Sequence, residues 1–126
     1  MTAPITPAGF TLPHSKEDEK YVVGVMLRYP DEVDEILVKL NEDDFYWDCH
    51  QRIFRAAQKL QRQDQAVDMT SVFGVLSDSK DLENIGGAVY LAELWEVAYQ
   101  TATVAWSIER VKAFSMRRQL IQACTD

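Results

Sequence analysis

The sequence predicts an all-α protein, a small bundle of about five to six helices that ends in one long helix. Apolar residues recur at intervals of three and four along most of the chain, and alternating strand patterns are weak. Helix start and stop signals recur about every fifteen residues. With 126 residues, 47% of them hydrophobic and 26% charged, the chain has the size and balance of one globular domain with one core.

The first helix is predicted between Ser15 and Tyr29. Serine is a residue type that caps helix N-termini, and Pro30 disfavours helical backbone at the residue before it. Gly24 lies inside this helix, where glycine costs up to about 1 kcal/mol relative to alanine. We therefore expect a second helix to cross closely at Gly24.

Three further helices are expected in the middle of the chain. One runs from Asp31 to about Leu40, and the next begins near Asp48 and is followed by a polar loop over residues 61–65. A short helix then runs from about Met69 to Leu76. The residues expected to be buried are, helix by helix, Val33, Ile36, Leu37 and Leu40; Ile53, Phe54, Ala57 and Leu60; and Val72, Phe73 and Leu76.

A glycine turn and the longest helix complete the predicted bundle. Gly86 and Gly87 predict a tight turn that opens a helix with Tyr90, Leu91, Leu94 and Ala98 at helical spacing. The last helix, from about Thr103 to Cys124, carries two apolar stripes, which is more than one core contact requires. One stripe is Val104, Ile108 and Val111, the other is Ala113, Met116 and Leu120, and they are joined by Trp106, Phe114 and Ile121.

Charge is distributed unevenly along the chain. Residues 1–50 carry 4 basic and 11 acidic side chains, whereas residues 103–126 carry 4 basic and 2 acidic ones. Affinity for nucleic acid comes mostly from neutralising phosphates, which an acidic surface opposes. Direct binding of duplex DNA is therefore not expected.

The chain also indicates where the protein acts. Residues 1–12 lack the basic flank and apolar stretch of a secretory signal and are predicted to be a flexible arm. The longest apolar run, Val22–Leu27, is too short to cross a bilayer. A cytoplasmic location is expected, and Cys49 and Cys124 are expected to be reduced thiols.

No pattern predicts a catalytic, cofactor or metal site. The five glycines do not form the Gly-x-x-x-x-Gly-Lys-[Ser/Thr] loop that binds ATP phosphates. His14, at a helix entry, has no nucleophile pattern beside it. The best candidate metal cluster lacks ligand spacing and is interpreted as a solvated acidic turn before a helix; its members are Asp43, Asp44, Asp48, Cys49 and His50.

Two groups of side chains could contact nucleic acid. The basic residues of the last helix could contact phosphate, but a solvated helix face is favoured for Arg110, Lys112, Arg117 and Arg118. The aromatic residues could stack on bases, but a place in the core or in a protein interface is favoured for Trp95, Tyr99 and Trp106.

The order of motifs adds a resemblance over about residues 12–121. The run Pro13-His14-Ser15, with Glu17, Glu19 and then Val22-Val23-Gly24, resembles the opening of DnaB-type replicative helicases. The same order continues through Asp44-Phe45-Tyr46, His50–Ala56, Val67-Asp68, Ile85–Leu91 and Arg118–Ile121. The chain departs from the family pattern at Tyr99 and Thr103, so the start of the last helix is expected to differ.

The resemblance implies that residues 13–126 are the N-terminal helical domain of such a helicase. In that family the last helix begins a helical hairpin, hairpins pair subunits in the collar of a hexameric ring, and the collar docks primase. A linker and a RecA-like ATPase domain follow, so ATP and Mg are expected only in that domain, and DNA contact only through the full ring. Trp106, Val111 and Phe114 are then expected at a contact between two copies. The acidic residues expected to steer a basic partner are Asp31, Glu32, Asp34 and Glu35.

Three other hypotheses remain open. The first is the helicase-binding helical domain of a primase, which would not carry Pro13-His14-Ser15 near its start. The second is a small enzyme that uses the acidic turn and His50. The third is a small helical module that binds nucleic acid.

Overall fold

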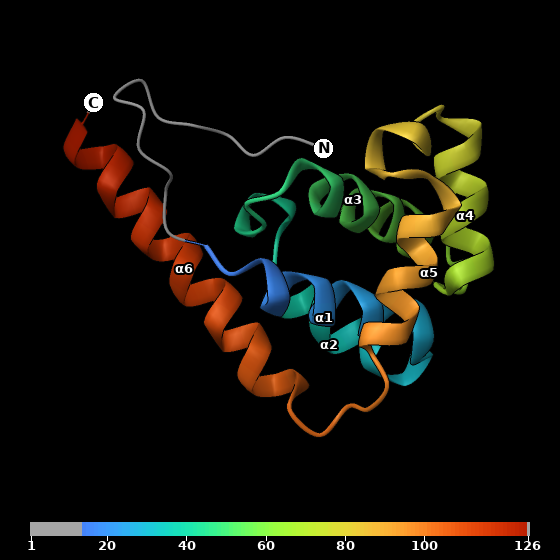
Figure 1. Ribbon diagram of the computed structural model, residues 1–126, viewed down its shortest axis with the longest axis horizontal. Coiled ribbons are helices and arrows are strands. Elements are labelled where there is room, and N and C mark those ends of the chain that lie inside the picture. The colour runs from blue at the N-terminus through green and yellow to red at the C-terminus, as the bar shows by residue number, and fades with distance from the viewer. Residues whose placement is uncertain (1–13, 126) are drawn as a thin grey trace.

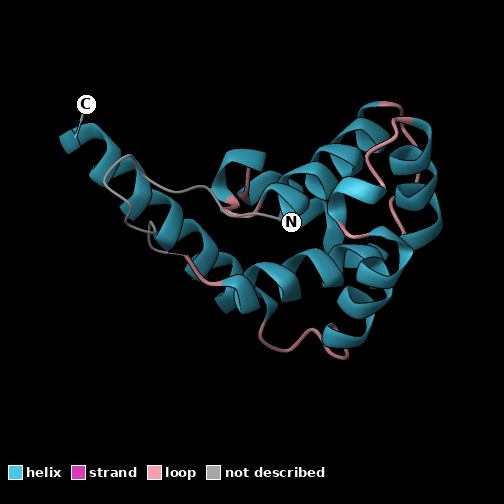
Figure 2. Ribbon diagram, turned by 45° about the horizontal axis from the view of Figure 1, so that its top comes forward, coloured by secondary structure: helices cyan, strands magenta, loops and turns pink. Residues whose placement is uncertain are grey.

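The computed structural model describes residues 14–125, and in this range the chain folds into helices and loops without strands (Figures 1 and 2). The prediction of an all-α bundle is confirmed. Residues 1–12, expected to be a flexible arm, lie outside the described residues. The helices are α1 (Lys16–Arg28), α2 (Val33–Lys39), α3 (Asp48–Arg62), α4 (Met69–Asp78), α5 (Gly87–Val97) and α6 (Val104–Thr125). Short 3-10 turns lie at Pro30–Glu32, Glu42–Asp44 and Glu83–Ile85.

Helix α1 is the centre of the bundle and packs against α5, α6 and α3. Its cap is the predicted one, because the Ser15 hydroxyl accepts a hydrogen bond from the backbone N–H of Asp18 at 3.4 Å. The helix ends before Pro30, with Tyr29 as its C-cap. Helices meet α1 on several sides, so its side chains from Tyr21 to Leu27 are all buried.

Gly24 lies at the crossing of α1 and α5, as the sequence predicted. A Cβ atom at Gly24 would collide with the Leu94 carbonyl oxygen and would lie 3.0 Å from the Cβ of Ala98. Only glycine lets the two helix backbones approach this closely. The helical cost of glycine is therefore offset by close packing.

The middle helices follow the prediction with two changes at their ends. All the residues predicted to be buried in α2 and α3 are buried. Helix α2 begins at Val33, because Pro30–Glu32 forms a 3-10 turn first. The polar loop predicted over residues 61–65 is wrong at its start, since α3 continues to Arg62. It stops where Asp64 takes a left-handed φ of 57°, and the N–H of Gln65 bonds back to the Leu60 carbonyl at 2.9 Å.

Helices α4 and α5 are also confirmed, with one correction. Val72 and Leu76 of α4 are buried, but Phe73 is 40% exposed and does not belong to the core. Its position lies about 100° around the helix from Val72, away from the single stripe that faces the bundle. Gly86 and Gly87 form the predicted turn, with φ values of 107° and 75° that favour glycine.

The last helix, α6, carries the two predicted stripes on opposite sides. Val104, Ile108 and Val111 are buried, and α6 lies along α1. The C-terminal end of the helix extends past the rest of the bundle (Figure 1). No helix in residues 14–125 is long and apolar enough to cross a membrane.

Candidate protein-interaction surface

The surface of α6 that faces away from the bundle carries most of its large apolar side chains. Trp106 is 59% exposed, Met116 61% and Leu120 68%. Helical geometry places these residues on one side of α6, opposite the buried Val104, Ile108 and Val111. We call this side the outer face of α6 and define it by Trp106, Phe114, Met116, Leu120 and Ile121.

Two arginines lie among these apolar side chains. The Arg110 guanidinium lies 4.8 Å from the centre of the Trp106 ring and 5.5 Å from that of Phe114. The Arg117 guanidinium lies 5.2 Å from the Phe114 ring centre. A shallow hollow is lined by these four side chains with Glu109 and Ala113. Exposed tryptophan and arginine are the residue types enriched at the centres of protein interfaces.

Val111, predicted with Trp106 and Phe114 to contact a second copy, is only 2% exposed. It belongs to the stripe that packs inward, about 140° around the helix from Trp106. Val111 therefore does not reach the surface of a single chain, and its place on or near a contact between two copies stays a prediction. Trp106 lies on the outer face and the half-buried Phe114 lies at its edge, and their part in a contact stays a prediction.

The acidic residues proposed to steer a partner lie together on the solvent side of the 3-10 turn and α2. Asp31, Asp34 and Glu35 are exposed, and Glu32 is partly exposed. Glu35 forms an ion pair with Lys39 at 2.7 Å, and this pair raises the pKa of the lysine. We call Asp31, Glu32, Asp34 and Glu35 the acidic face of α2.

The sequence predicted that the basic residues of α6 form a solvated helix face, and most of them do not. Arg110 donates to the Asp18 carboxylate at 2.8 Å, and Lys112 lies 3.1 Å from the Asp44 carboxylate. Arg118 is 6% exposed, and burial lowers its pKa. Three of the four basic side chains therefore contact the bundle, which makes them poor candidates for phosphate contacts.

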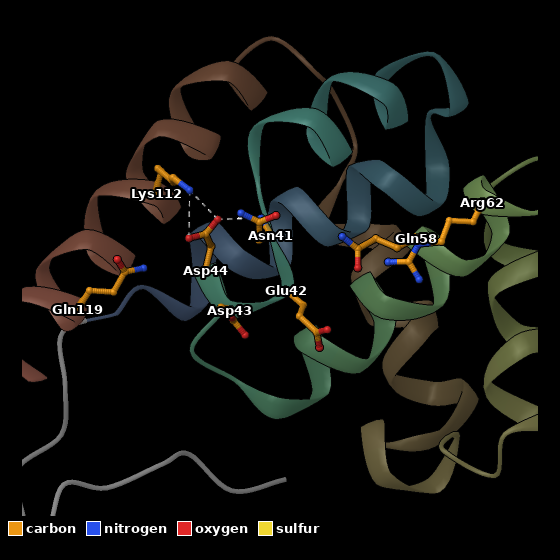
Figure 3. A pocket seen from close by; sticks show the side chains of 8 residues that line it. All are labelled: Asn41, Glu42, Asp43, Asp44, Gln58, Arg62, Lys112 and Gln119. Atoms are coloured by element: carbon orange, nitrogen blue, oxygen red, sulfur yellow. Dashed lines mark hydrogen bonds and ion pairs between the residues drawn. The ribbon is translucent and has the colours of Figure 1, made fainter.

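The acidic turn before α3 is also not fully solvated. Asp43 is exposed, but Asp44 is 2% exposed and accepts hydrogen bonds from the Asn41 N–H, the Ser115 hydroxyl and the Lys112 ammonium. Figure 3 shows the Asp44 carboxylate between Asn41 and Lys112, at one side of a polar hollow. The other lining residues of that hollow are Glu42, Asp43, Gln58, Arg62 and Gln119. The burial of Asp44 could not be predicted from the sequence, because two of its partners, Lys112 and Ser115, lie on α6, about seventy residues later.

His50 is a fully buried part of the structure. Its Nδ1 lies 2.8 Å from the Glu19 carboxylate and its Nε2 lies 2.6 Å from the Tyr90 hydroxyl. The Glu19 carboxylate also accepts the backbone N–H of Tyr46 at 2.7 Å. Burial raises the pKa of Tyr90 far above its usual value. Such a closed network holds helices together and leaves His50 without access to a substrate.

The remaining candidates for chemistry do not come together. His14 stacks on the Tyr46 ring at 4.0 Å between ring centres. Within residues 14–125, no group of three or more His, Cys, Asp or Glu side chains is arranged to hold a metal ion. Both cysteines are free thiols, Cys49 buried and Cys124 exposed. The site with the most distinctive chemistry is thus the outer face of α6, a surface suited to another protein.

Comparison with known proteins identifies the family. The model of the DnaB-like helicase N-terminal domain matches residues 11–113, most of the chain. The chain belongs to this DnaB-like family. It is 32% identical over 118 residues to the replicative DNA helicase DnaB of Pasteurella multocida. This match covers 94% of this chain but 25% of that protein. It is 35% identical over 118 residues to the DnaB of Rhodothermus marinus, with 94% of this chain and 12% of that protein covered.

A solved structure agrees with the DnaB-like assignment. The N-terminal domain of DnaB helicase from Mycobacterium tuberculosis superposes with a TM-score of 0.85 at 29% identity. The match covers 91% of this chain and 83% of that structure. The DnaB-like chain thus spans a quarter or less of the two curated relatives, but most of this solved N-terminal domain.

Proposed function

We propose that the chain is the collar domain of a replicative DNA helicase, which pairs subunits and docks primase. The observation that carries the proposal is the outer face of α6, an exposed apolar and aromatic surface on a domain whose core is already complete. Its curated relatives are replicative DNA helicases. The domain itself performs no catalysis in this proposal, and ATP and Mg act in a separate ATPase domain of the parent protein.

Pairing through α6 is supported by the spacing of the outer residues. Trp106, Ala113 and Leu120 recur every seven residues, and Arg110 and Arg117 repeat at the same interval between them. A seven-residue repeat keeps one seam of a helix facing a partner helix over several turns. A second copy of α6 would bury this seam, and exposed apolar side chains favour such burial.

Docking of primase is proposed on the paired domains, with the acidic face of α2 steering the approach. Within the described residues, one of these four carboxylates forms an ion pair, Glu35 with Lys39, so the acidic face of α2 keeps a net negative charge. Surface charge of one sign speeds association with a basic partner and repels DNA phosphates. The proposal puts the domain with the replication machinery in the cytoplasm.

Calorimetric titration with the C-terminal domain of the cognate primase tests the docking proposal. We expect binding that weakens modestly when salt is raised, because exposed charges are screened. Changing Asp31, Asp34 and Glu35 to alanine should slow association, as measured by stopped flow. The free energy of unfolding, measured by thermal denaturation, should change by less than about 0.5 kcal/mol.

A single-stranded DNA oligonucleotide in the same buffers is the control for nucleic-acid binding. The proposal expects no comparable heat with the oligonucleotide. Tight DNA binding without primase binding would reject the collar function and favour a nucleic-acid module.

A further inference from the structure

The distal half of α6 is joined to the bundle by polar contacts. The inward positions Val104, Ile108 and Val111 are apolar, but the next two inward positions are Ser115 and Arg118. These two side chains are 1% and 6% exposed, so they are as buried as the valines before them. Apart from the small buried Ser107, the inward side of the helix is therefore apolar up to Val111 and polar after it.

Both polar side chains contact the turn before α3. The Ser115 hydroxyl donates to the Asp44 carboxylate at 2.7 Å, and the Arg118 guanidinium donates to the Asp44 carbonyl at 2.7 Å. Lys112 adds a contact of 3.1 Å to the same carboxylate. The Arg118 guanidinium also lies 5.5 Å from the centre of the Tyr46 ring. One residue of the turn, Asp44, thus receives three side chains from α6.

The turn is itself fixed to the bundle. The Glu19 carboxylate of α1 accepts the backbone N–H groups of Tyr46 and Trp47 at 2.7 and 3.3 Å. Gln51 of α3 donates to the Phe45 carbonyl at 2.8 Å. The carboxylate of Asp44 accepts the Asn41 N–H, which closes the turn on itself. Asp44 is therefore a rigid point against which α6 is held.

Polar contacts of this kind fix a geometry more strictly than apolar packing does. Apolar contact is non-directional, so several tilts of a helix can bury a similar apolar area. A buried carboxylate or guanidinium loses much more when its partners move out of hydrogen-bonding geometry. Leaving Asp44 or Arg118 buried without its partners is unfavourable, so one orientation of α6 is preferred over its neighbours.

We propose that Asp44, Ser115 and Arg118 form a polar latch that fixes the direction of the distal half of α6. The latch lies on the side of the helix opposite Leu120, so it sets where the outer face points. The inference that the latch helps subunits to pair rests on the function proposed above. Its effect on the direction of α6 is independent of that function. The three members are positioning residues, which act by holding the helix that carries the contact surface.

The direction of α6 can be measured by distances between two spin labels. Cys124 is a natural exposed label site at the end of α6, and Cys49 is buried and should stay unlabelled. A Lys59→Cys change gives the second site, on the exposed surface of α3. Labelled chains are diluted with an excess of unlabelled chains, so that pulsed electron paramagnetic resonance reports distances within one chain.

Arg118→Met tests the latch, because methionine keeps the apolar part of the side chain and removes the donors. We expect the distance distribution to broaden and shift, while the helical circular dichroism stays unchanged. Arg117→Met is the matched control, because the adjacent Arg117 is exposed and stacks on Phe114 of its own helix. The control should keep the narrow distribution of the starting protein.

A second variant keeps the test decisive if Arg118→Met fails to fold. The double change Lys112→Met with Ser115→Ala removes the two α6 side chains that contact the Asp44 carboxylate, and should also broaden the distribution. Self-association of the latch variants should weaken by about tenfold or more, because the direction of α6 that pairs loses the preference that about one hydrogen bond to a charged group gives it. Broadened distances in a protein that never self-associates would support the latch and reject the pairing function. Unchanged distances in the folded variants would overturn the latch.

Discussion

Gly24 is the residue at which α1 and α5 approach most closely, and it offers a clear test of the packing. A Gly24→Ala change places a methyl group against the Leu94 carbonyl, so the helices must separate. We expect a loss of about 1–3 kcal/mol in the free energy of unfolding, despite the better helix propensity of alanine. Chemical denaturation of the variant measures this change.

Gly74 of α4 is the matched control for Gly24. Nothing lies within 4 Å of a Cβ atom built at this position. Gly74→Ala should therefore raise the free energy of unfolding by about 0.4–1 kcal/mol, because alanine restricts the unfolded chain. Equal effects at Gly24 and Gly74 would contradict the close crossing.

The two thiols should differ in reactivity. Burial raises the pKa of the Cys49 thiol, which keeps it protonated, and its side chain is fully buried. Cys124 is exposed on α6. Alkylation of the native protein at pH 8 should modify Cys124 alone, and Cys49 should react only after unfolding. Rapid modification of both thiols, measured by mass spectrometry, would show that the helix α3 region opens readily.

At the scale of the helix, α2 separates stability from surface charge. Leu37 is buried against the core, and its neighbour Val38 is 82% exposed. Leu37→Ala should lower the free energy of unfolding by about 2–5 kcal/mol, because it leaves a cavity. Val38→Ala is the control and should change stability by less than about 0.5 kcal/mol. Thermal denaturation measures both variants. A comparable loss of unfolding free energy in both would show that Leu37 does not lie on the buried side of α2.

The helices could be predicted from the sequence because their apolar residues follow helical spacing. The cap at Ser15, the crossing at Gly24 and the glycine turn at Gly86 each depend on one local rule, and each is present. Phe73 was placed inside because apolarity alone does not tell which side of a short helix faces the core. Helix α3 extends through Gln61 and Arg62 because polar side chains suit the solvent side of a helix.

The candidate site could be predicted only in part, for a different reason. The second apolar stripe of α6 is visible in the sequence, and it forms most of the outer face. The inward polar residues Ser115 and Arg118 gave no local signal, because their partner Asp44 is distant in sequence. The same distance hid the pair of Glu19 and His50, although a carboxylate three residues before the buried Val22 could have suggested a buried partner.

At the scale of the whole molecule, the described chain combines a complete core with one extended helix. The core joins all six helices through side chains of each. The outer face of α6 adds nothing to that core, and Trp106, Met116 and Leu120 stay in contact with water in a single chain. Such a surface is expected to be covered when the protein works, and a second copy of the same helix suits its seven-residue spacing.

Sedimentation equilibrium of the purified chain tests this central claim most directly, with two variants beside it. Leu120→Asp puts a charge on the outer face of α6, and Val89→Asp puts one on an exposed position of α5. The account predicts that the unaltered chain and Val89→Asp form dimers at high concentration, and that Leu120→Asp weakens the dimer by about a hundredfold or more. A chain that stays monomeric at high concentration, or a dimer unaffected by Leu120→Asp, would contradict it.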